Sequence, residues 1–271
     1  MTSEFHENPL DPVAGLELVG SICAPFHWVL RDSQQNEWIK NGTVSFIDTG
    51  TAVFAVTACH VIDACIADAE TPDFVQCMIG GPLNTLYFKL KDRLIDRNQA
   101  MDLATLKVSE CEIVNLGWSV FRGLQIGWPP PPTERDYGVI FCGYPGKSRS
   151  LLSPRDIMFG RAGAAATVSS VREAKISLLI EREKMVQHLG DGELTDDYDF
   201  GGISGGPLVV AAQKAGKLGW MAAGIITSGP NPGSDPSQDS ISGLDLFQAT
   251  PIQFVKENGY LDTERWHNAN P

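Results

Sequence analysis

Short runs of apolar residues, separated by Gly, Pro, Asn and Asp, recur along the whole chain. Many of them are rich in β-branched residues, which favours strands over helices. The runs of strand length are LELVGSIC (16–23), TVSFID (43–48), AVFAVTA (52–58), FVQCMI (74–79), LATLKV (103–108), YGVIFCG (137–143), ISLLI (176–180), PLVVAA (207–212) and WMAAGIIT (220–227). Long patterns with the period of an amphipathic helix are missing, so the sequence predicts an all-β protein.

Turn and boundary signals lie between these runs. Asp48, Thr49 and Gly50 join two of them and predict a β-hairpin. Four consecutive prolines in GWPPPPTERD (127–136) cannot continue a strand ladder, so they predict part of a linker between two strand-rich halves. The turn-rich segment SGPNPGSDPSQDSISG (228–243) predicts a long loop near the C-terminus.

Helix signals gather near the end of the chain. Thr250 is a candidate N-cap, Pro251 suits the first helical position, and Gln253 completes a capping box. Gly259 then provides a stop signal. We therefore expect a C-terminal helix over residues 251–259.

Composition and charge narrow the class of protein. The 271 residues are 43% apolar and 20% charged, which is typical of a soluble globular protein. Because 21 Lys and Arg face 33 Asp and Glu, the net charge is −12, and such a surface repels nucleic acid and anionic membranes. The acidic N-terminus resembles no signal peptide and no later segment is long enough to span a membrane, so we expect a cytoplasmic protein.

The cysteines and histidines predict neither a disulfide framework nor a metal site. No C-x-x-C pair occurs among the six cysteines, and buried free thiols are the favoured interpretation. The five histidines are scattered and form no H-E-x-x-H motif or His-Cys cluster. We therefore expect no metal and no other cofactor.

The stretch DFGGISGGPLVV (199–210) surrounds Ser204 with four glycines. Glycine reaches backbone angles that other residues avoid, but at a cost in chain entropy, so such a cluster needs a reason. One reason is a tight turn that leads into a strand. The other is that Ser204 is a nucleophile whose neighbours point backbone N–H groups at a developing negative charge.

The second interpretation requires a base near the serine and a group that orients this base, because a hydroxyl at its ordinary pKa is a weak nucleophile. VTACHVIDAC places His60 at the end of a predicted strand, where a helical turn begins. MDLATLKV places Asp102 directly before another predicted strand. This position distinguishes Asp102 from Asp63, Asp92 and Asp96 as the orienting acid.

The motifs TACHV (57–61), DLATL (102–106) and GISGGP (202–207) occur in this order and resemble the three signatures of chymotrypsin-like (trypsin-fold) serine proteases. The pattern is most similar to bacterial HtrA-type and trypsin-like peptidase domains, and it covers most of residues 15–257. Three lesser matches support it: LTD (194–196), GYPG (143–146) and GIITSG (224–229).

The resemblance implies a single peptidase domain over residues 1–271, built from two antiparallel six-stranded β-barrels. The first barrel spans 15–120 and carries the histidine and the aspartate. The linker spans 121–136, and the second barrel spans 137–250 and carries the serine. The C-terminal helix over 251–259 completes the domain.

The resemblance also implies the role of each residue. Ser204 attacks the scissile carbonyl, His60 transfers the proton to the leaving amine, and Asp102 fixes the imidazole tautomer and stabilises its cation. The backbone N–H groups of Gly202 and Ser204 form the oxyanion hole. The expected activity is that of a serine endopeptidase, which cuts a protein or peptide substrate through an acyl-enzyme intermediate.

One position departs from the digestive members of the family. Ile203 stands where they carry an aspartate that pairs with a new N-terminal amine after proenzyme cleavage. We expect Ile203 to pack into an apolar pocket instead. The oxyanion loop is then either preformed or ordered by a regulatory protein partner.

The substrate-binding residues follow from position relative to the serine. Tyr198 is expected at or near the base of the primary pocket, and Thr227, Ser228 and Gly229 along one wall, where they pair the substrate as an added strand. Three nearby acids are either solvated or favour a basic substrate side chain: Asp196, Asp197 and Asp199.

Other functions fit the sequence less well. An α/β-hydrolase elbow requires a histidine after Ser204, and only His267 follows; moreover, Pro207 begins a strand-like run where an elbow needs a helix. Cys59 suits a small buried thiol better than a nucleophile.

A catalytically silent peptide-binding or regulatory protein of the same fold ranks below the enzyme because all three motifs are intact. An esterase shares the motifs. The physiological substrate, its preferred side chain and the oligomeric state stay open.

Overall fold

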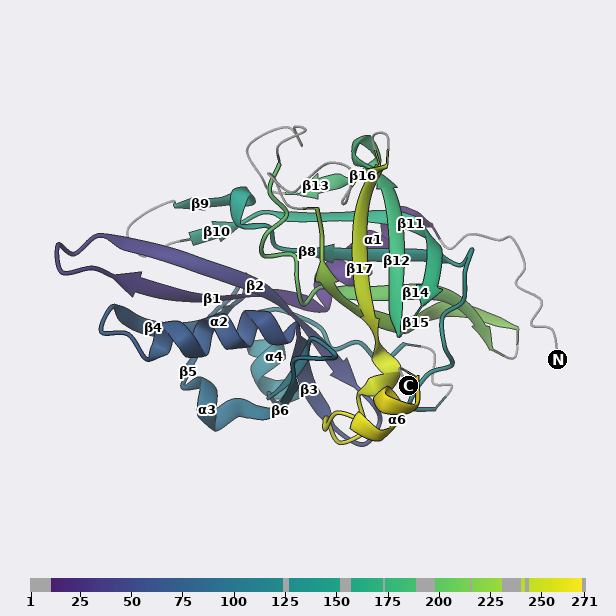
Figure 1. Ribbon diagram of the computed structural model, residues 1–271, viewed down its shortest axis with the longest axis horizontal. Helices are drawn as coiled ribbons and strands as arrows, with labels where there is room; N and C mark the ends of the chain where they lie inside the picture. Colours follow the sequence, from purple (N-terminus) through teal and green to yellow (C-terminus); the bar gives the residue numbers. More distant parts are fainter. Residues whose placement is uncertain are drawn as a thin grey trace.

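The computed structural model describes residues 11–123, 127–151, 157–172, 174–188, 198–214, 216–230, 240–241 and 244–269. These residues form two large antiparallel β-sheets that pack against each other, together with a separate two-stranded sheet and short helices at the periphery (Figure 1). The predicted all-β class is confirmed.

The first sheet curls into a half-barrel of seven strands in the order β5-β4-β1-β2-β3-β7-β6. The strands are β1 (Cys23–Arg31), β2 (Glu37–Asp48), β3 (Val53–Thr57), β4 (Phe74–Gly80), β5 (Thr85–Phe88), β6 (Leu94–Asn98) and β7 (Leu103–Lys107). Because β5 and β6 stay at opposite edges, this half is more open than the closed six-stranded barrel that the family resemblance implied.

The second sheet closes into a six-stranded barrel, because β12 pairs with both β11 and β17. Its strands are β8 (Gly138–Gly143), β11 (Arg161–Arg172), β12 (Lys175–Glu181), β14 (Pro207–Lys214), β15 (Lys217–Ser228) and β17 (Leu244–Pro251). Short strands extend it or lie beside it: β13 (Val186–His188), β16 (Ser240–Ile241) and the pair β9 (Arg149–Leu151) and β10 (Ile157–Phe159).

Helices and helical turns cover the ends and outer faces of the sheets. They are α1 (Pro12–Ser21), α2 (Cys59–Ala69), α3 (Leu90–Arg93), α4 (Glu110–Leu116), α6 (Thr263–Ala269) and the 3₁₀ turns η1 (Gly146–Ser148), η2 (Arg182–Lys184) and η3 (Ile252–Phe254). In Figure 1, α2, α3 and α4 gather beside the half-barrel. No helix of the described residues is long and apolar enough to cross a bilayer.

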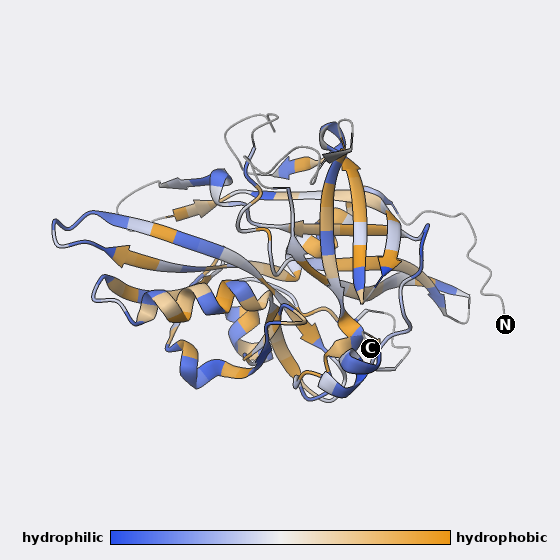
Figure 2. Ribbon diagram, viewed as in Figure 1, coloured by the Kyte–Doolittle hydropathy of each residue, from blue (hydrophilic) through white to orange (hydrophobic). Residues whose placement is uncertain are grey.

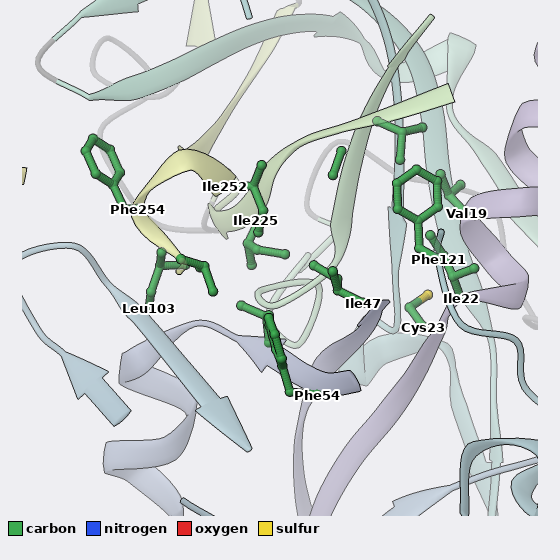
Figure 3. Close-up of a cluster of buried hydrophobic side chains, with 14 of the residues drawn as sticks. Val19, Ile22, Cys23, Ile47, Phe54, Leu103, Phe121, Ile225, Ile252 and Phe254 are labelled. Atoms are coloured by element: carbon green, nitrogen blue, oxygen red, sulfur yellow. The ribbon is translucent and has the colours of Figure 1, made fainter. Parts of the chain in front are cut away.

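A buried apolar cluster joins the two sheets. Its members include Val19 of α1, Phe54 of β3 and Ile225 of β15, each no more than 1% exposed (Figure 3). Burial of a side chain of this size contributes about 2 kcal/mol relative to exposure. Figure 2 shows the corresponding pattern, with hydrophobic residues concentrated along the barrel strands and hydrophilic ones at the tip of the β1–β2 hairpin.

Eight of the nine predicted strands lie in observed strands, and the hairpin at Gly50 is confirmed by the pairing of Asp48 with Val53. The run over 16–23 is the exception, because it belongs mostly to helix α1. Asp11 caps this helix by accepting a hydrogen bond from Val13 N at 3.0 Å. The signal that the strand interpretation overlooked is therefore Asp11 followed by Pro12.

The predicted C-terminal helix over 251–259 is wrong in position. Only the turn η3 forms there, and helix α6 begins at Thr263. The expected capping groups serve other partners, since Thr250 Oγ1 donates to Met101 O at 2.7 Å and Gln253 Nε2 donates to Pro131 O at 2.9 Å. The predicted linker carries no strand over 127–136, and most of the predicted loop over 228–243 lies outside the described residues.

All six cysteines are free, and Cys111 alone is exposed. The sulfur atoms of Cys23 on β1 and Cys142 on β8 lie 3.4 Å apart, so two thiols meet where the sheets join. The described residues contain no cluster of His, Cys, Asp or Glu that could hold a metal ion.

His27 on β1 predicts a loss of stability in acid. The side chain is 4% exposed, and its Nδ1 has no hydrogen-bond partner among the described residues. Burial, together with the charge of Arg149, lowers the pKa of His27 to about 4, although a backbone hydrogen bond with Pro25 opposes the shift. Because the unfolded chain takes up the proton first, at a pKa of about 6.5, folding stability is lost as the pH falls from 6.5 towards 4.

We expect His27 to remove about 3 kcal/mol from the free energy of unfolding between pH 7 and pH 4. Urea denaturation of the wild type and of His27→Gln at both pH values measures this contribution. The variant should show a smaller difference between the two pH values. An identical acid dependence in both proteins would show that His27 does not carry the effect.

Candidate active site

Ser204 lies in a tight turn that both sheets hold. Its carbonyl accepts a hydrogen bond from Thr43 N of β2 at 2.8 Å, and the next residue, Gly205, donates to Ile226 O of β15 at 2.7 Å. Gly202 and Gly205 have φ values of +102° and +97°, a region that favours glycine. Gly202 and Gly205 therefore serve a backbone conformation that other residues adopt only with strain.

Ile203 anchors this turn in the core of the closed barrel. The side chain is 1% exposed and belongs to the same apolar cluster as Phe141 and Phe247. A Cβ atom on Gly143 would lie 2.6 Å from Ile203 Cγ1, so the glycine makes room for it. The prediction that Ile203 packs into an apolar pocket is confirmed.

Two backbone N–H groups of the turn have no acceptor among the described residues, and they are those of Gly202 and Ser204. Their neighbours are all engaged. Gly201 N donates to Asp199 Oδ1 at 2.7 Å, Ile203 N to Phe200 O at 3.0 Å, and Gly206 N to Ile203 O at 3.0 Å. These two N–H groups without an acceptor are the ones that the sequence predicts as the oxyanion hole.

His60 is the second residue of α2, and Asp102 lies between β6 and β7. The imidazole Nδ1 lies 2.9 Å from Asp102 Oδ2 and 3.1 Å from Oδ1, and the backbone N–H of His60 donates to Oδ1 at 2.9 Å. One carboxylate therefore fixes both the ring and the backbone of His60. The side chain of Asp102 is 23% exposed, so this carboxylate is only partly buried.

Asp102 adopts an uncommon backbone conformation with φ of +54°. For a residue other than glycine this conformation costs about 1 to 2 kcal/mol. Such strain is found mainly where the surrounding structure requires a particular geometry. Here it accompanies the contact of the carboxylate with His60.

The competing candidates are engaged elsewhere. Asp63 forms an ion pair with Arg97 and accepts a hydrogen bond from Gln99 Nε2 at 2.9 Å. Asp96 accepts from Leu261 N at 2.9 Å. Burial and the neighbouring Asp63 raise the pKa of the Cys59 thiol to about 12, so this group is a poor nucleophile at neutral pH.

His60 and Ser204 line the same cleft, which has a volume of about 710 Å³. They are not hydrogen-bonded to each other. Ser204 Oγ instead donates to Thr227 O at 3.4 Å, a long and weak contact. The side chain of His60 is about half exposed, and no described residue is bonded to its Nε2.

Thr227, Ser228 and Gly229 line the cleft, as the sequence predicts. The pairing of β14 with β15 ends at Ile225, and Ile226 bonds to Gly205 and Gly206, so the edge of β15 is open towards the cleft only from Thr227 onwards. Tyr198 is not among the residues that line the cleft. It is buried, its hydroxyl pairs with Ser148 Oγ, and its ring packs at 4.9 Å from that of Phe200.

Of the three acids before the serine, Asp199 lines the cleft, whereas Asp196 and Asp197 lie outside the described residues. Lys175 of β12 is a neighbour of Asp102 that no sequence signal indicates. Its Nζ donates to Thr250 Oγ1 at 2.9 Å and to Thr227 Oγ1 at 3.4 Å. Burial lowers the pKa of Lys175, and the negative charge of Asp102 opposes this shift.

No profile of a known protein family matches the sequence, and no curated protein sequence matches it. A solved structure described as "Aromatic interactions drive the coupled folding and binding of the intrinsically disordered Sesbania mosaic virus VPg protein" is similar, with 12% sequence identity and a TM-score of 0.41. The match covers 89% of this chain and 99% of that chain. Similarity at this level supports no conclusion about function. The closed barrel and the half-barrel are themselves compatible with a trypsin-like fold.

Proposed function

We propose that the protein is a serine endopeptidase with a chymotrypsin-like arrangement of Ser204, His60 and Asp102. The observation that carries the proposal is the shared cleft. An imidazole held by a carboxylate at 2.9 Å and a serine with two unpaired N–H groups beside it line the same cavity. This set of groups supplies a base, a nucleophile and oxyanion donors.

In the proposed reaction, His60 Nε2 takes the proton of Ser204 as Oγ attacks the scissile carbonyl carbon. The carbonyl oxygen gains negative charge and accepts hydrogen bonds from Gly202 N and Ser204 N. The imidazolium then protonates the leaving amine, and Asp102 stabilises its charge throughout. Water, activated by the same imidazole, releases the acyl group from Ser204.

The serine hydroxyl has to turn from Thr227 O towards His60 for this reaction. The contact it leaves is 3.4 Å long, so little free energy is lost. In proteins without substrate, catalytic hydrogen bonds are often long and shorten once substrate binds. The open edge of β15 at Thr227 to Gly229 suits an extended peptide, which adds as a strand and brings its carbonyl to the serine.

A fluorophosphonate probe tests the proposal on the purified chain. We expect labelling of one serine, lost in Ser204→Ala and retained in Ser119→Ala, an exposed serine outside the cleft. Efficient labelling of the chain alone would also exclude an obligatory activating partner. A peptide-library digest with the wild type and Ser204→Ala then separates a peptidase from an esterase.

Two outcomes would overturn the proposal. Labelling that persists in Ser204→Ala would assign the nucleophile to another residue. A folded wild type that shows no labelling and no cleavage across the neutral and alkaline range would favour a peptide-binding protein without catalytic activity, in which the contact of Ser204 with Thr227 is the resting arrangement.

A further inference from the structure

The cleft carries positive charge although the whole chain has a net charge of −12. Three basic side chains line it: Lys40, Lys147 and Arg149. Lys40 is neutralised by Asp68, at 2.9 Å between Nζ and Oδ2. Lys147 and Arg149 have no ion-pair partner among the described residues.

Arg149 is the more informative of these two residues because it is partly buried. Its Nη1 donates to Asn41 Oδ1 at 3.0 Å, and no other hydrogen bond engages its guanidinium among the described residues. Removal from water lowers the pKa of Arg149, and no carboxylate offsets this cost. A guanidinium offers five N–H donors in a planar fork, so most of its capacity faces no protein partner.

The hydrogen bonds around Ser204 locate Arg149 on one side of the nucleophile. The carbonyl of Ser204 bonds to Thr43 of β2, whereas its hydroxyl bonds to Thr227 of β15. Arg149 bonds to Asn41, which precedes Thr43 by two positions on β2. Arg149 therefore lies on the β2 side, across the serine from the open edge of β15.

This position relates Arg149 to a defined part of the substrate, an argument that rests on the proposed function. If the acyl half of a peptide pairs with Thr227 to Gly229, its leaving-group half crosses Ser204 towards β2 and the η1 turn. Side chains of that half then meet Lys147 and Arg149. Carboxylates match a guanidinium because both oxygens accept parallel N–H bonds.

We propose that Arg149, with Lys147 beside it, forms a subsite for an aspartate or glutamate side chain in the leaving-group half of the substrate. The proposal places the acid at one of the first three leaving-group positions, because Arg149 and Ser204 line the same cleft and an extended chain advances about 3.3 Å per residue. Asp199, the acidic residue in the same cleft, is held by Gly201 N on the serine turn and does not bond to Arg149.

Matched peptides test this subsite. Each pair carries Glu or Gln at one of the first three leaving-group positions and is otherwise identical. We expect kcat/KM to be about tenfold higher for the glutamate peptide at one position, since a hydrogen bond to a charged group is worth about 1.5 kcal/mol or more. The preference should weaken at high salt.

Three variants assign the preference to its residue. Arg149→Gln should reduce the Glu-to-Gln ratio to about 1, and Arg149→Glu should favour a lysine peptide. Lys147→Gln, an exposed position whose replacement spares the fold, should reduce the ratio in part. Arg135→Gln, in an exposed segment outside the cleft, should leave the ratio unchanged.

A binding measurement keeps this proposal separate from the proposed catalysis. Fluorescence anisotropy with Ser204→Ala reports the affinity of the same labelled peptides without any cleavage. A Glu preference in binding that Arg149→Gln removes supports the subsite even if the wild type proves inactive. Equal affinity and equal cleavage of the Glu and Gln peptides at all three positions would overturn the subsite while leaving the peptidase proposal intact.

Discussion

Replacement of Asp102 by asparagine is expected to lower kcat for peptide cleavage by about four orders of magnitude. Asp102 Oδ1 accepts the backbone N–H of His60 at 2.9 Å, and its carboxylate also contacts Nδ1. In the variant the amide oxygen keeps the backbone contact, so the NH₂ group faces Nδ1. Nδ1 then has to accept, which leaves the proton on Nε2 and removes the base for Ser204.

Steady-state kinetics, normalised by active-site titration, measure this effect. Asp92→Asn is the matched control, since Asp92 is an exposed acid on α3 far from the cleft residues in sequence and is absent from its lining. The control should retain full activity. A loss of less than tenfold in Asp102→Asn would mean that the carboxylate does not select the tautomer of His60.

Gly205→Ala is expected to lower the free energy of unfolding by about 4 kcal/mol, as the sum of backbone strain and overpacking. The φ value of Gly205 is +97°, and a Cβ atom there would lie 1.7 Å from Thr43 O and 2.4 Å from Thr57 Oγ1. Relief requires β2 or the serine turn to move. We therefore also expect a loss of fluorophosphonate labelling.

Gly50→Ala separates the two causes, because Gly50 has φ of +86° and a Cβ atom there would meet nothing within 4 Å. It should lose only the strain component, about 1 kcal/mol. Urea denaturation of both variants gives the comparison. Equal losses in the two proteins would show that the close approach of β2 to Gly205 is not what demands glycine there.

Local sequence signals predict those strands and turns whose conformation is favoured by neighbouring residues in the chain. The hairpin at Asp48 to Gly50 and the strand after Pro207 both carry β-branched runs next to turn residues. Strand β11 was missed, because its Arg161–Arg172 segment begins with small residues that have weak strand preference. The close packing of β11 against β8 explains these small residues, since a Cβ on Gly163 would lie 2.4 Å from Phe141 O.

Helix α1 was missed for a related reason. Gly15 and Gly20 weaken its helical signal, yet both are required where the helix packs on the barrel. A Cβ on Gly15 would lie 2.2 Å from Ile140, and one on Gly20 would lie 1.9 Å from Arg161. Tertiary contacts of this kind do not appear in local sequence patterns.

The residues of the candidate site also fall into two groups, those that a sequence motif indicates and those that no motif indicates. Short motifs in a fixed order indicate His60, Asp102 and Ser204, although contacts between distant segments hold these residues in place. Arg149 and Lys175 have no such motif, because each reaches the cleft region through a contact between segments distant in the chain. Tyr198 was assigned by its distance in sequence from the serine, but the direction of its side chain is set by the hydrogen bond to Ser148.

The turn that carries Ser204 lies directly before β14, a strand of the closed barrel, yet the other sheet anchors its carbonyl groups. Thr43 Oγ1 donates to Gly202 O at 2.8 Å, Thr43 N to Ser204 O at 2.8 Å, and Ser45 Oγ to Gly205 O at 2.7 Å. Neither half alone can therefore keep the nucleophile in place. We therefore expect that, when the protein is denatured gradually, separation of the two halves abolishes labelling of Ser204 while the strands of each half are still intact.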